Sequence, residues 1–395
     1  MPMTFAKRMQ DMKASEIREI LKVTEDPEII SFAGGIPAPE LFPVKEIVKV
    51  TEIVLEEAGE QALQYGTTEG YTPLREKIAK RMNERFKTDF SLENILITNG
   101  SQQGLDFSGK IFIDEGDVIL CESPTYLAAI NAFKAYQPQF IEIQTDEEGM
   151  VITHLQRVLE STEKIKFIYI VPDFQNPSGA SWSPQRREQF MAVVKNYEVM
   201  VIEDNPYSEI RFEGERPFSV KALDEKGQVV CLGTFSKTFC PGLRIGWVAA
   251  EKSILEKYIL VKQSADLHSS TLNQRTISKY IDLYDFDANI DKIKAVYKKR
   301  RDVMVKTMEQ TFPQQIRFTR PSGGLFLWVE LPESVDAKEV LVKSLEYKVA
   351  FVPGEAFFPN QGRKNTFRLN YSNMSEERIM EGIKRLAVVL ESYCS

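Results

Sequence analysis

Short apolar runs alternate with amphipathic stretches through the middle of the chain, and the two patterns predict strands and helices. The apolar runs that we interpret as strands cover residues 94–98, 117–121, 139–143, 166–171, 198–202, 228–233 and 245–249. Between them, the amphipathic stretches predict helices over residues 101–113, 125–136, 154–159, 184–196 and 252–264. Because strands alternate with crossover helices, we predict a large α/β domain over residues 50–290.

The two ends of the chain carry other patterns. Residues 44–58 predict an amphipathic helix, and Thr72 and Pro73 supply an N-cap and a first-turn proline for a helix that runs to about residue 86. After the large domain we expect a long charged helix, three strands and a closing helix, over residues 287–311, 324–330, 350–352, 366–371 and 375–393. These elements predict a smaller α+β domain over residues 291–395, against which residues 1–49 pack.

The composition argues against several classes of protein. The 395 residues include 50 Lys and Arg against 57 Asp and Glu, which gives a net charge of −7, and no basic run forms a surface for nucleic acid. We find no stretch of about 18 apolar residues, which a membrane helix needs. The four cysteines are widely spaced and do not resemble a disulfide framework. We predict a cytoplasmic protein with small-molecule partners and with no nucleic-acid or membrane partner.

Histidines are too few for most metal and hydrolase chemistry. His154 and His268 cannot hold zinc unless carboxylates or thiols supply the other ligands, so we predict no metal site. A hydrolase would depend on one of the same two imidazoles, and no G-x-S-x-G elbow presents a serine. Hydrolysis is therefore a weak second choice.

Clusters of polar residues follow four of the predicted strands. Ligands of α/β sheets bind where the carboxyl ends of strands open into a crevice, so these clusters form the candidate site. The clusters cover residues 99–102, 173–179, 203–207 and 234–237, and the last is followed closely by Arg244.

Lys237 and Asp204 stand at two of these strand ends. A lysine that is partly desolvated in a crevice loses its proton more easily and can form a Schiff base, although a strand-end lysine can equally reach solvent. A buried Asp204 needs a cation or a donor, such as the protonated nitrogen of a cofactor ring, but it can equally open an Asx turn before Pro206. Each segment taken alone leaves both interpretations open.

Ser101 and Gln102 begin a predicted helix after a glycine turn. The free backbone N–H groups and the positive end of the helix dipole can receive a phosphate there. Thr234, Ser236 and Arg244 could complete the cradle. A plain serine N-cap is the alternative for this segment taken alone.

Together these clusters resemble the pyridoxal-phosphate aminotransferases of fold type I, over nearly the whole chain. The most specific motif is Ser236-Lys237 with the following residues 241–246, and residues 176–179 and the pair Asp204 and Tyr207 accompany it in the family's order. Residues 31–37, 63–66, 70–71, 100–103 and 265–268 look like the bacterial 2-aminoadipate/kynurenine aminotransferase subgroup. The resemblance implies a mostly parallel mixed sheet flanked by helices, and pyridoxal 5′-phosphate as the cofactor.

The resemblance also implies a role for each candidate residue. Lys237 is expected to hold the cofactor as a Schiff base and then to move the substrate proton. Asp204 is expected to pair with the ring nitrogen. Asn176 and Tyr207 are expected to hydrogen-bond the phenolic oxygen of the ring, and Tyr126 is expected to stack on the ring face. The residues expected to hold the phosphate are Ser101, Gln102, Thr234, Ser236, Arg244 and, from a second subunit, Tyr65. This last role implies a homodimer.

Three further residues are implied to bind the substrate beside Asn176. Arg368 matches the arginine that clamps the α-carboxylate through two parallel hydrogen bonds. Gly35 lies in the 31–37 motif. Arg18 resembles an arginine that binds the distal carboxylate of acidic substrates, but it fits the solvated face of an amphipathic helix equally well. Aromatic, kynurenine-like and branched-chain donors therefore stay open beside 2-aminoadipate.

We thus predict a transaminase that works by two half-reactions, with 2-oxoglutarate as the expected acceptor. A pyridoxal-phosphate lyase on the same fold is one alternative, because the cofactor clusters do not decide which Cα bond breaks. A non-catalytic, effector-sensing domain of a regulator is another. The segment before the large domain is too short for a winged helix, which counts against that alternative.

Overall fold

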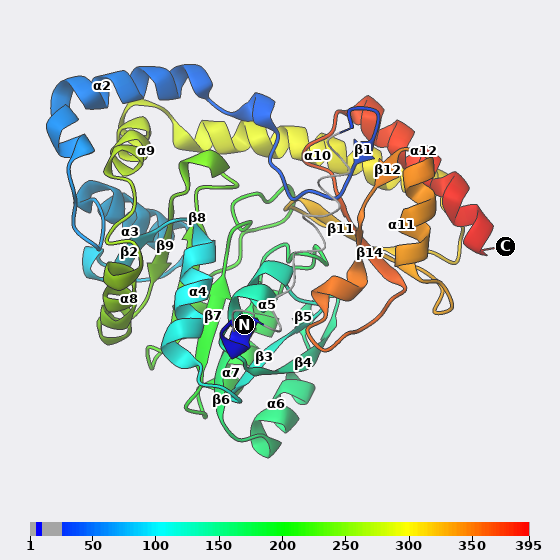
Figure 1. The fold of residues 1–395 in the computed structure, drawn as a ribbon, viewed down its shortest axis with the longest axis horizontal. Helices are drawn as coiled ribbons and strands as arrows, with labels where there is room; N and C mark the ends of the chain where they lie inside the picture. Colours follow the sequence, from blue (N-terminus) through cyan, green and yellow to red (C-terminus); the bar gives the residue numbers. More distant parts are fainter. Residues whose placement is uncertain (1–4, 10–25, 395) are drawn as a thin grey trace, which may run out of the picture.

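A computed structural model describes residues 5–9 and 26–394 of the protein. Its centre is an eight-stranded sheet in the order β2-β9-β8-β7-β6-β3-β4-β5 (Figure 1). These strands are β2 (Ile95–Thr98), β3 (Val118–Ser123), β4 (Gln139–Asp146), β5 (Gly149–Met150), β6 (Ile165–Ile170), β7 (Met200–Asp204), β8 (Val229–Thr234) and β9 (Gly246–Ala249). The seven predicted strands are confirmed, and the short strand β5 was not predicted.

The centre of this sheet is parallel and its edges are antiparallel. The consecutive neighbours from β4 through β3, β6 and β7 to β8 are parallel, whereas β9 runs antiparallel to both β8 and β2. Every residue of β8 is buried. Parallel strands covered on both faces read as continuous apolar runs, which is why the sequence pattern located them.

Helices flank the large sheet. They are α2 (Val44–Leu63), α3 (Thr72–Phe86), α4 (Ser101–Phe112), α5 (Leu127–Lys134), α6 (Ile152–Ser161), α7 (Pro184–Val194), α8 (Lys252–Ala265) and α9 (Thr271–Leu283). The helix predicted to end at residue 58 continues to Leu63 across a kink, because Ala58 has the non-helical angles φ −150° and ψ 37°. Helix α9, which packs along α2, was not predicted. Within the described part of the chain, no helix is both long and apolar enough to cross a membrane.

The C-terminal part holds a second sheet. It is four-stranded and antiparallel, in the order β10-β11-β14-β13. Its elements are β10 (Arg317–Phe318), β11 (Phe326–Glu330), β13 (Val352–Pro353), β14 (Thr366–Asn370) and the helices α10 (Phe286–Thr311), α11 (Ala337–Glu346) and α12 (Glu376–Cys394). Helix α10 packs on α12. The strand predicted over 350–352 is divided between β12 (Val349–Ala350) and β13, and α11 was not predicted.

Residues 30–32 join this C-terminal part, whereas Lys7 forms an ion pair with Glu115, just before β3 of the large sheet. Strand β1 (Ile30–Ser31) pairs in parallel with β12, and Phe32 continues the contact through its backbone N–H to Ala350. The domain boundaries after residues 49 and 290 stay predictions. Helix α2 spans the first boundary and α10 spans the second, so continuous helices cross both.

Candidate active site

The carboxyl ends of β7 and β8 and the N-terminus of α4 surround a cavity of about 260 Å³. Most of the candidate residues from the sequence line it. These residues are Ser101, Gln102, Tyr126, Asn176, Asp204, Tyr207, Thr234, Ser236, Lys237 and Arg244. Val171, Pro206 and Pro241 also line the cavity and were not predicted.

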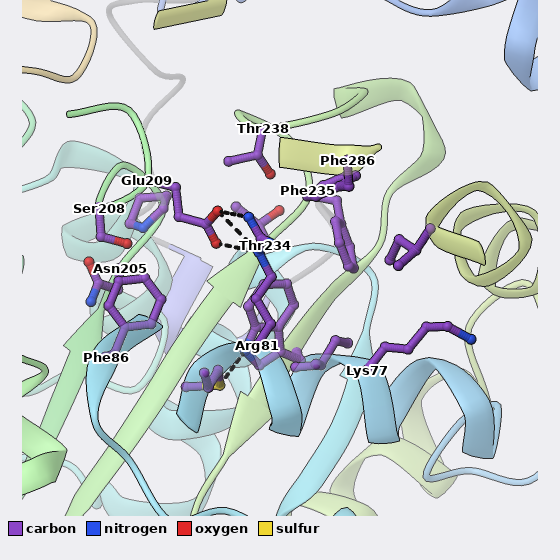
Figure 2. A pocket seen from close by; sticks show the side chains of 15 residues that line it. Lys77, Arg81, Phe86, Asn205, Ser208, Glu209, Thr234, Phe235, Thr238 and Phe286 are labelled. Atoms are coloured by element: carbon purple, nitrogen blue, oxygen red, sulfur yellow. Dashed lines mark hydrogen bonds and ion pairs between the residues drawn. The ribbon is translucent and has the colours of Figure 1, made fainter. Parts of the chain in front are cut away.

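A second, smaller cavity shares Thr234 and Pro206 with the first. Its wall is mainly aromatic and aliphatic, and Arg81 forms an ion pair with Glu209 beside it (Figure 2). Its volume of about 30 Å³ is far smaller than the 260 Å³ of the first cavity. The larger cavity is therefore the only one of the two that can receive a cofactor or a substrate.

Lys237 lies three residues after the end of β8 and is largely buried. Its Nζ donates to the backbone carbonyl of Gly35 at 2.8 Å, so the two residues meet although 202 positions separate them. Burial lowers the pKa of Lys237 to about 8, and the positive charges of Arg368 and Arg244 act in the same direction. About a tenth of the amine is thus neutral at pH 7, far more than for an ordinary lysine, and the neutral form is the nucleophile.

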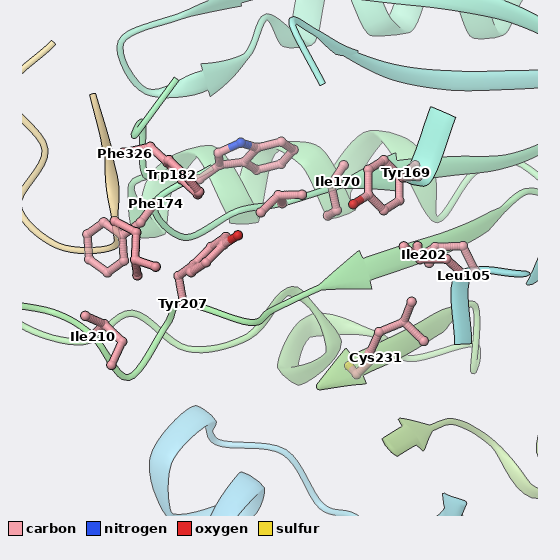
Figure 3. Packing of buried hydrophobic residues seen from close by; sticks show 14 of the residues in the cluster. Leu105, Tyr169, Ile170, Phe174, Trp182, Ile202, Tyr207, Ile210, Cys231 and Phe326 are labelled. Atoms are coloured by element: carbon pink, nitrogen blue, oxygen red, sulfur yellow. The ribbon is translucent and has the colours of Figure 1, made fainter. Parts of the chain in front are cut away.

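Asp204 ends β7 and is 1% exposed. The hydroxyl of Tyr169, on β6, donates to its Oδ2 at 2.9 Å, whereas Oδ1 has no hydrogen-bond partner among the described residues. Figure 3 shows Tyr169, Ile202 and Tyr207 in the buried cluster around this strand. Burial raises the pKa of Asp204 to about 7, against the opposing effect of the Tyr169 hydrogen bond. A buried oxygen without a donor is costly unless a ligand supplies one.

The N-terminus of α4 is shaped to receive an anion. Gly100 precedes the helix with φ +74° and ψ 169°, and a Cβ there would lie 2.6 Å from Nη2 of Arg244. The Thr234 hydroxyl donates to Ser236 Oγ at 2.9 Å beside this turn, and both residues line the cavity. Backbone N–H groups, two hydroxyls and a guanidinium thus converge, which favours a phosphate.

Arg368 projects from β14 and is 2% exposed. Its Nη1 donates to Asn176 Oδ1 at 2.7 Å and its Nη2 to the carbonyl of Ala33 at 2.6 Å, while the guanidinium lies 4.2 Å from the ring centre of Phe326. No carboxylate of the described chain pairs with it, and Nε has no partner there. Burial lowers the pKa of Arg368 to about 10. A buried guanidinium without a counter-charge is suited to bind an anionic ligand.

Three polar side chains complete the wall. Asn176 and Tyr207 are buried and hydrogen-bonded to each other, and the Tyr207 ring packs edge-on against Phe326 at 5.9 Å. Burial raises the pKa of Tyr126 to about 12, so its hydroxyl keeps its proton. Tyr126 immediately precedes α5 and lines the cavity with the other two.

One candidate residue lies outside the cavity, and another is not among the described residues. Tyr65 is 78% exposed and lines a separate surface groove, where its ring meets His268 edge-on at 5.8 Å. Arg18 falls outside the described residues. Gly35 does approach the site, and a Cβ on it would lie 2.8 Å from the Phe326 ring.

The sequence pattern missed two groups that act on the site. The Ala33 carbonyl holds Arg368, but every residue carries a carbonyl and no sequence signal distinguishes this one. Tyr169 is a polar hydroxyl in the otherwise largely apolar strand β6, and this was a weak signal that the pattern did offer.

The occupant of this cavity must offer a carbonyl to an amine, a hydrogen-bond donor to a buried acid, and a phosphate to a helix N-terminus. Pyridoxal 5′-phosphate carries all three: an aldehyde, a phosphate and a ring nitrogen that donates a hydrogen bond when protonated. The fold and the cavity therefore define a pyridoxal-phosphate enzyme of fold type I.

Comparison with known proteins identifies the family within this class of enzymes. The family model "Aminotransferase class I and II" matches residues 27–386, and the chain belongs to this family of aminotransferases. It is 47% identical to aromatic-amino-acid aminotransferase 1 of Thermococcus litoralis, over 98% of this chain and 94% of that protein. It is 40% identical to 2-aminoadipate transaminase of Thermus thermophilus, over 98% and 96%.

A solved structure gives the same assignment. The kynurenine aminotransferase of Pyrococcus horikoshii, solved in complex with PMP, superposes with a TM-score of 0.95 at 42% identity, over 99% of this chain and 98% of that one. The likeness to the 2-aminoadipate/kynurenine aminotransferase subgroup is thereby confirmed.

Proposed function

We propose that this aminotransferase moves the amino group of an L-amino acid to a 2-oxo acid in two half-reactions that use one cavity. The observation that carries the proposal is Arg368, which is buried beside Lys237 and has no counter-charge among the described residues. An amino acid and a 2-oxo acid share an α-carboxylate, so one arginine serves both. Because both substrates need the same guanidinium, we infer that they bind in turn, as in a ping-pong mechanism.

We propose that the residues of the cavity each contact a different part of the cofactor. Lys237 attaches it, Asp204 faces the ring nitrogen, and Tyr126 stacks on the ring face. The ring oxygen is bonded by Asn176 and Tyr207. The phosphate is held by Ser101, Gln102, Thr234, Ser236 and Arg244. When bound, pyridoxal 5′-phosphate supplies an aldehyde that condenses with amines and a ring that accepts electron density from Cα.

Lys237 then acts as the proton carrier. Its lowered pKa leaves Nζ neutral in a useful fraction of molecules, so that it can take the proton from the substrate Cα. The Gly35 carbonyl accepts a hydrogen bond from Nζ at 2.8 Å and can hold the freed amine near the reacting carbon. Arg368 Nη1 donates to the Asn176 amide oxygen. This hydrogen bond connects the residue proposed to bind the ring oxygen of the cofactor with the residue proposed to bind the substrate carboxylate.

For the amino donor we propose an aromatic, kynurenine-like or 2-aminoadipate substrate, with 2-oxoglutarate as the acceptor. The support is similarity to relatives named for aromatic amino acids, 2-aminoadipate and kynurenine. A donor screen with Arg18→Ala beside the wild type tests this proposal. If Arg18 binds a distal carboxylate, the variant loses activity with 2-aminoadipate and keeps activity with phenylalanine. Poor acidic donors together with no effect of the substitution would refute the aminoadipate assignment.

A single half-reaction separates this activity from that of a lyase on the same fold. With one donor and no acceptor, transamination releases about one 2-oxo acid per subunit and leaves the amino group on the cofactor. Continued release of ammonia and pyruvate from a β-substituted amino acid would instead indicate elimination.

We also propose that the enzyme is a homodimer in which Tyr65 reaches the phosphate of the other subunit. Its 78% exposure and the exposed apolar residues Val44, Val48 and Leu63 of α2 support a covered surface at this place. Sedimentation at micromolar concentration tests the dimer, and Tyr65→Phe tests the contact through the affinity for the cofactor. A cytoplasmic location and the lack of nucleic-acid and membrane partners stay predictions.

A further inference from the structure

Lys262 is a buried lysine that the reaction does not use. It lies on α8, is 0% exposed and does not line the cavity. Its Nζ donates to Asp266 at 2.9 Å, to Gln103 Oε1 at 3.0 Å and to Ser269 Oγ at 3.1 Å. Three acceptors satisfy the three N–H bonds of an ammonium group, so the charge is retained inside the protein.

Asp266 connects this lysine to the phosphate end of α4. Its Oδ2 accepts from Asn99 Nδ2 at 2.5 Å and from Gln103 Nε2 at 2.7 Å. Gln103 in turn accepts from the backbone N–H of Asn99 at 2.9 Å. Asn99 and Gln103 bracket residues 100–102, of which Ser101 and Gln102 line the cavity. The carbonyl of Asn99 also accepts from Arg244 at 3.3 Å.

The same ion pair adjoins the exposed surface around Tyr65. Leu267, next to Asp266, has φ +66°, a left-handed conformation that leucine rarely adopts. It is 41% exposed, and the following residue, His268, contacts the Tyr65 ring. The hydrogen-bond chain continues from Ser269, whose carbonyl accepts from Gln274 Nε2. Gln274 Oε1 in turn accepts from the backbone N–H of Tyr71.

We propose that Lys262 and Asp266 are positioning residues that hold the phosphate-binding end of α4 in shape and link it to the surface around Leu267 and Tyr65. The pair touches neither the cavity nor its occupant. It acts through Asn99 and Gln103, which are fixed only while Asp266 keeps its place and its charge. The inference rests on the proposed role of Ser101 and Gln102 in phosphate binding.

The test compares two ligands that differ only in the phosphate. The full-length chain, freed of cofactor, is titrated with pyridoxal 5′-phosphate and with pyridoxal, and the ratio of the two dissociation constants is measured. Lys262→Met keeps the length of the side chain and removes the ammonium. We expect it to weaken binding of pyridoxal 5′-phosphate by about tenfold or more and to change pyridoxal binding by less than about twofold, because the loss falls on charge-assisted phosphate contacts.

The matched control is Lys221→Met. Lys221 is also buried, at 4% exposure, and pairs with Asp224 at 3.0 Å and Glu251 at 3.2 Å, away from the cavity. This control is expected to lower the unfolding temperature and to leave the ratio of dissociation constants unchanged. If Lys262→Met fails to fold, Asp266→Asn replaces it, since it conserves volume and removes only the charge that Asn99 and Gln103 share.

One outcome would contradict the proposed phosphate site, and another would contradict the positioning role of Lys262 and Asp266. A wild-type protein that binds pyridoxal as tightly as pyridoxal 5′-phosphate would contradict the proposed cradle itself. A wild type that discriminates, together with folded Lys262 and Asp266 variants that discriminate equally well, would leave the cradle in place and reduce the ion pair to a structural role. As a second readout on the proposed dimer, we expect the Lys262 and Asp266 variants to dissociate into monomers at a higher protein concentration than the wild type does.

Discussion

Two neighbouring acids on β7 show how the two sides of the large sheet differ. Glu203 is 0% exposed and accepts from the Ser219 hydroxyl at 2.6 Å and from the backbone N–H groups of Val220 and Lys221 at 3.0 and 3.1 Å. Asp204 is equally buried but accepts only from Tyr169, and its second oxygen has no partner in the described chain. The protein thus supplies donors to both oxygens of Glu203, whereas the described residues leave one oxygen of Asp204 without a donor.

Two buried arginines repeat the contrast. Arg187, at 0% exposure, pairs with Asp173 at 2.9 Å and uses its remaining nitrogens on backbone carbonyls. Arg368 has one amide, one carbonyl and two aromatic rings around it, with no acid among the described residues. Buried charges that the chain satisfies stabilise the fold, and those it leaves incomplete mark the place of a ligand.

The largest effect is expected from Lys237→Ala. Within the described residues, the amine of Lys237 donates only to a backbone carbonyl, and its loss removes both the proposed attachment point and the proposed proton carrier. We expect turnover to fall by about 10⁴-fold. The absorbance band of the lysine-bound cofactor should also disappear, and borohydride should no longer fix cofactor to the chain. Normal turnover by this variant would refute the assignment.

Asp204→Asn and Glu203→Gln test the two acids directly. The first should lower kcat by about 10² to 10³, because the ring nitrogen loses its ionised partner, and should leave the cofactor-free fold intact. The second should leave kcat near wild type and lower the free energy of unfolding by about 1–3 kcal/mol, because buried donors lose their charged acceptor. Kinetics and urea denaturation of both variants measure the contrast, and equal effects on kcat would abolish it.

Arg368→Met and Arg187→Met make the corresponding test for the arginines. Removing Arg368 should lower kcat/KM by about 100-fold, since two charge-assisted bonds to the substrate carboxylate are lost. Removing Arg187 takes away one of the two cations that pair with the buried Asp173, which keeps Arg211 at 3.0 Å, and should destabilise the protein by about 1–3 kcal/mol. Its effect on kcat/KM, measured at a temperature where the variant is folded, should be far smaller.

A final prediction concerns the dependence of stability on pH in the cofactor-free protein. Burial raises the pKa of Asp204 and of Glu122 to about 7, from ordinary values of 3.8 and 4.5. Between those values only the folded chain keeps the two protons, so stability is highest below about pH 4 for these groups and falls as the pH rises to about 7. Urea unfolding at pH 5 and 7.5 measures the loss, and Asp204→Asn should reduce it. A loss of unchanged size would show that Asp204 does not titrate in this range.

How far the sequence predicted the molecule depends on the kind of signal. All strands of the large sheet except β5, and the helices between them, were found because their apolar patterns are local. Helices α9 and α11 were missed, and strand β1 was missed because its two residues acquire strand geometry only by pairing with β12. The candidate residues Asp204, Lys237 and Arg244 were found because each belongs to a short motif at a strand end.

The sequence by itself determined the elements, the strand-end clusters and the family, because periodicity and short motifs are properties of neighbouring residues. The tertiary structure alone decided which charges lack a partner. Arg368 meets Asn176 across 192 positions, Lys237 meets a carbonyl 202 positions away, and one oxygen of Asp204 has no donor among the residues that the structure describes. Whether a charge is satisfied depends on every group that the fold brings within about 3 Å, and no local pattern contains that information.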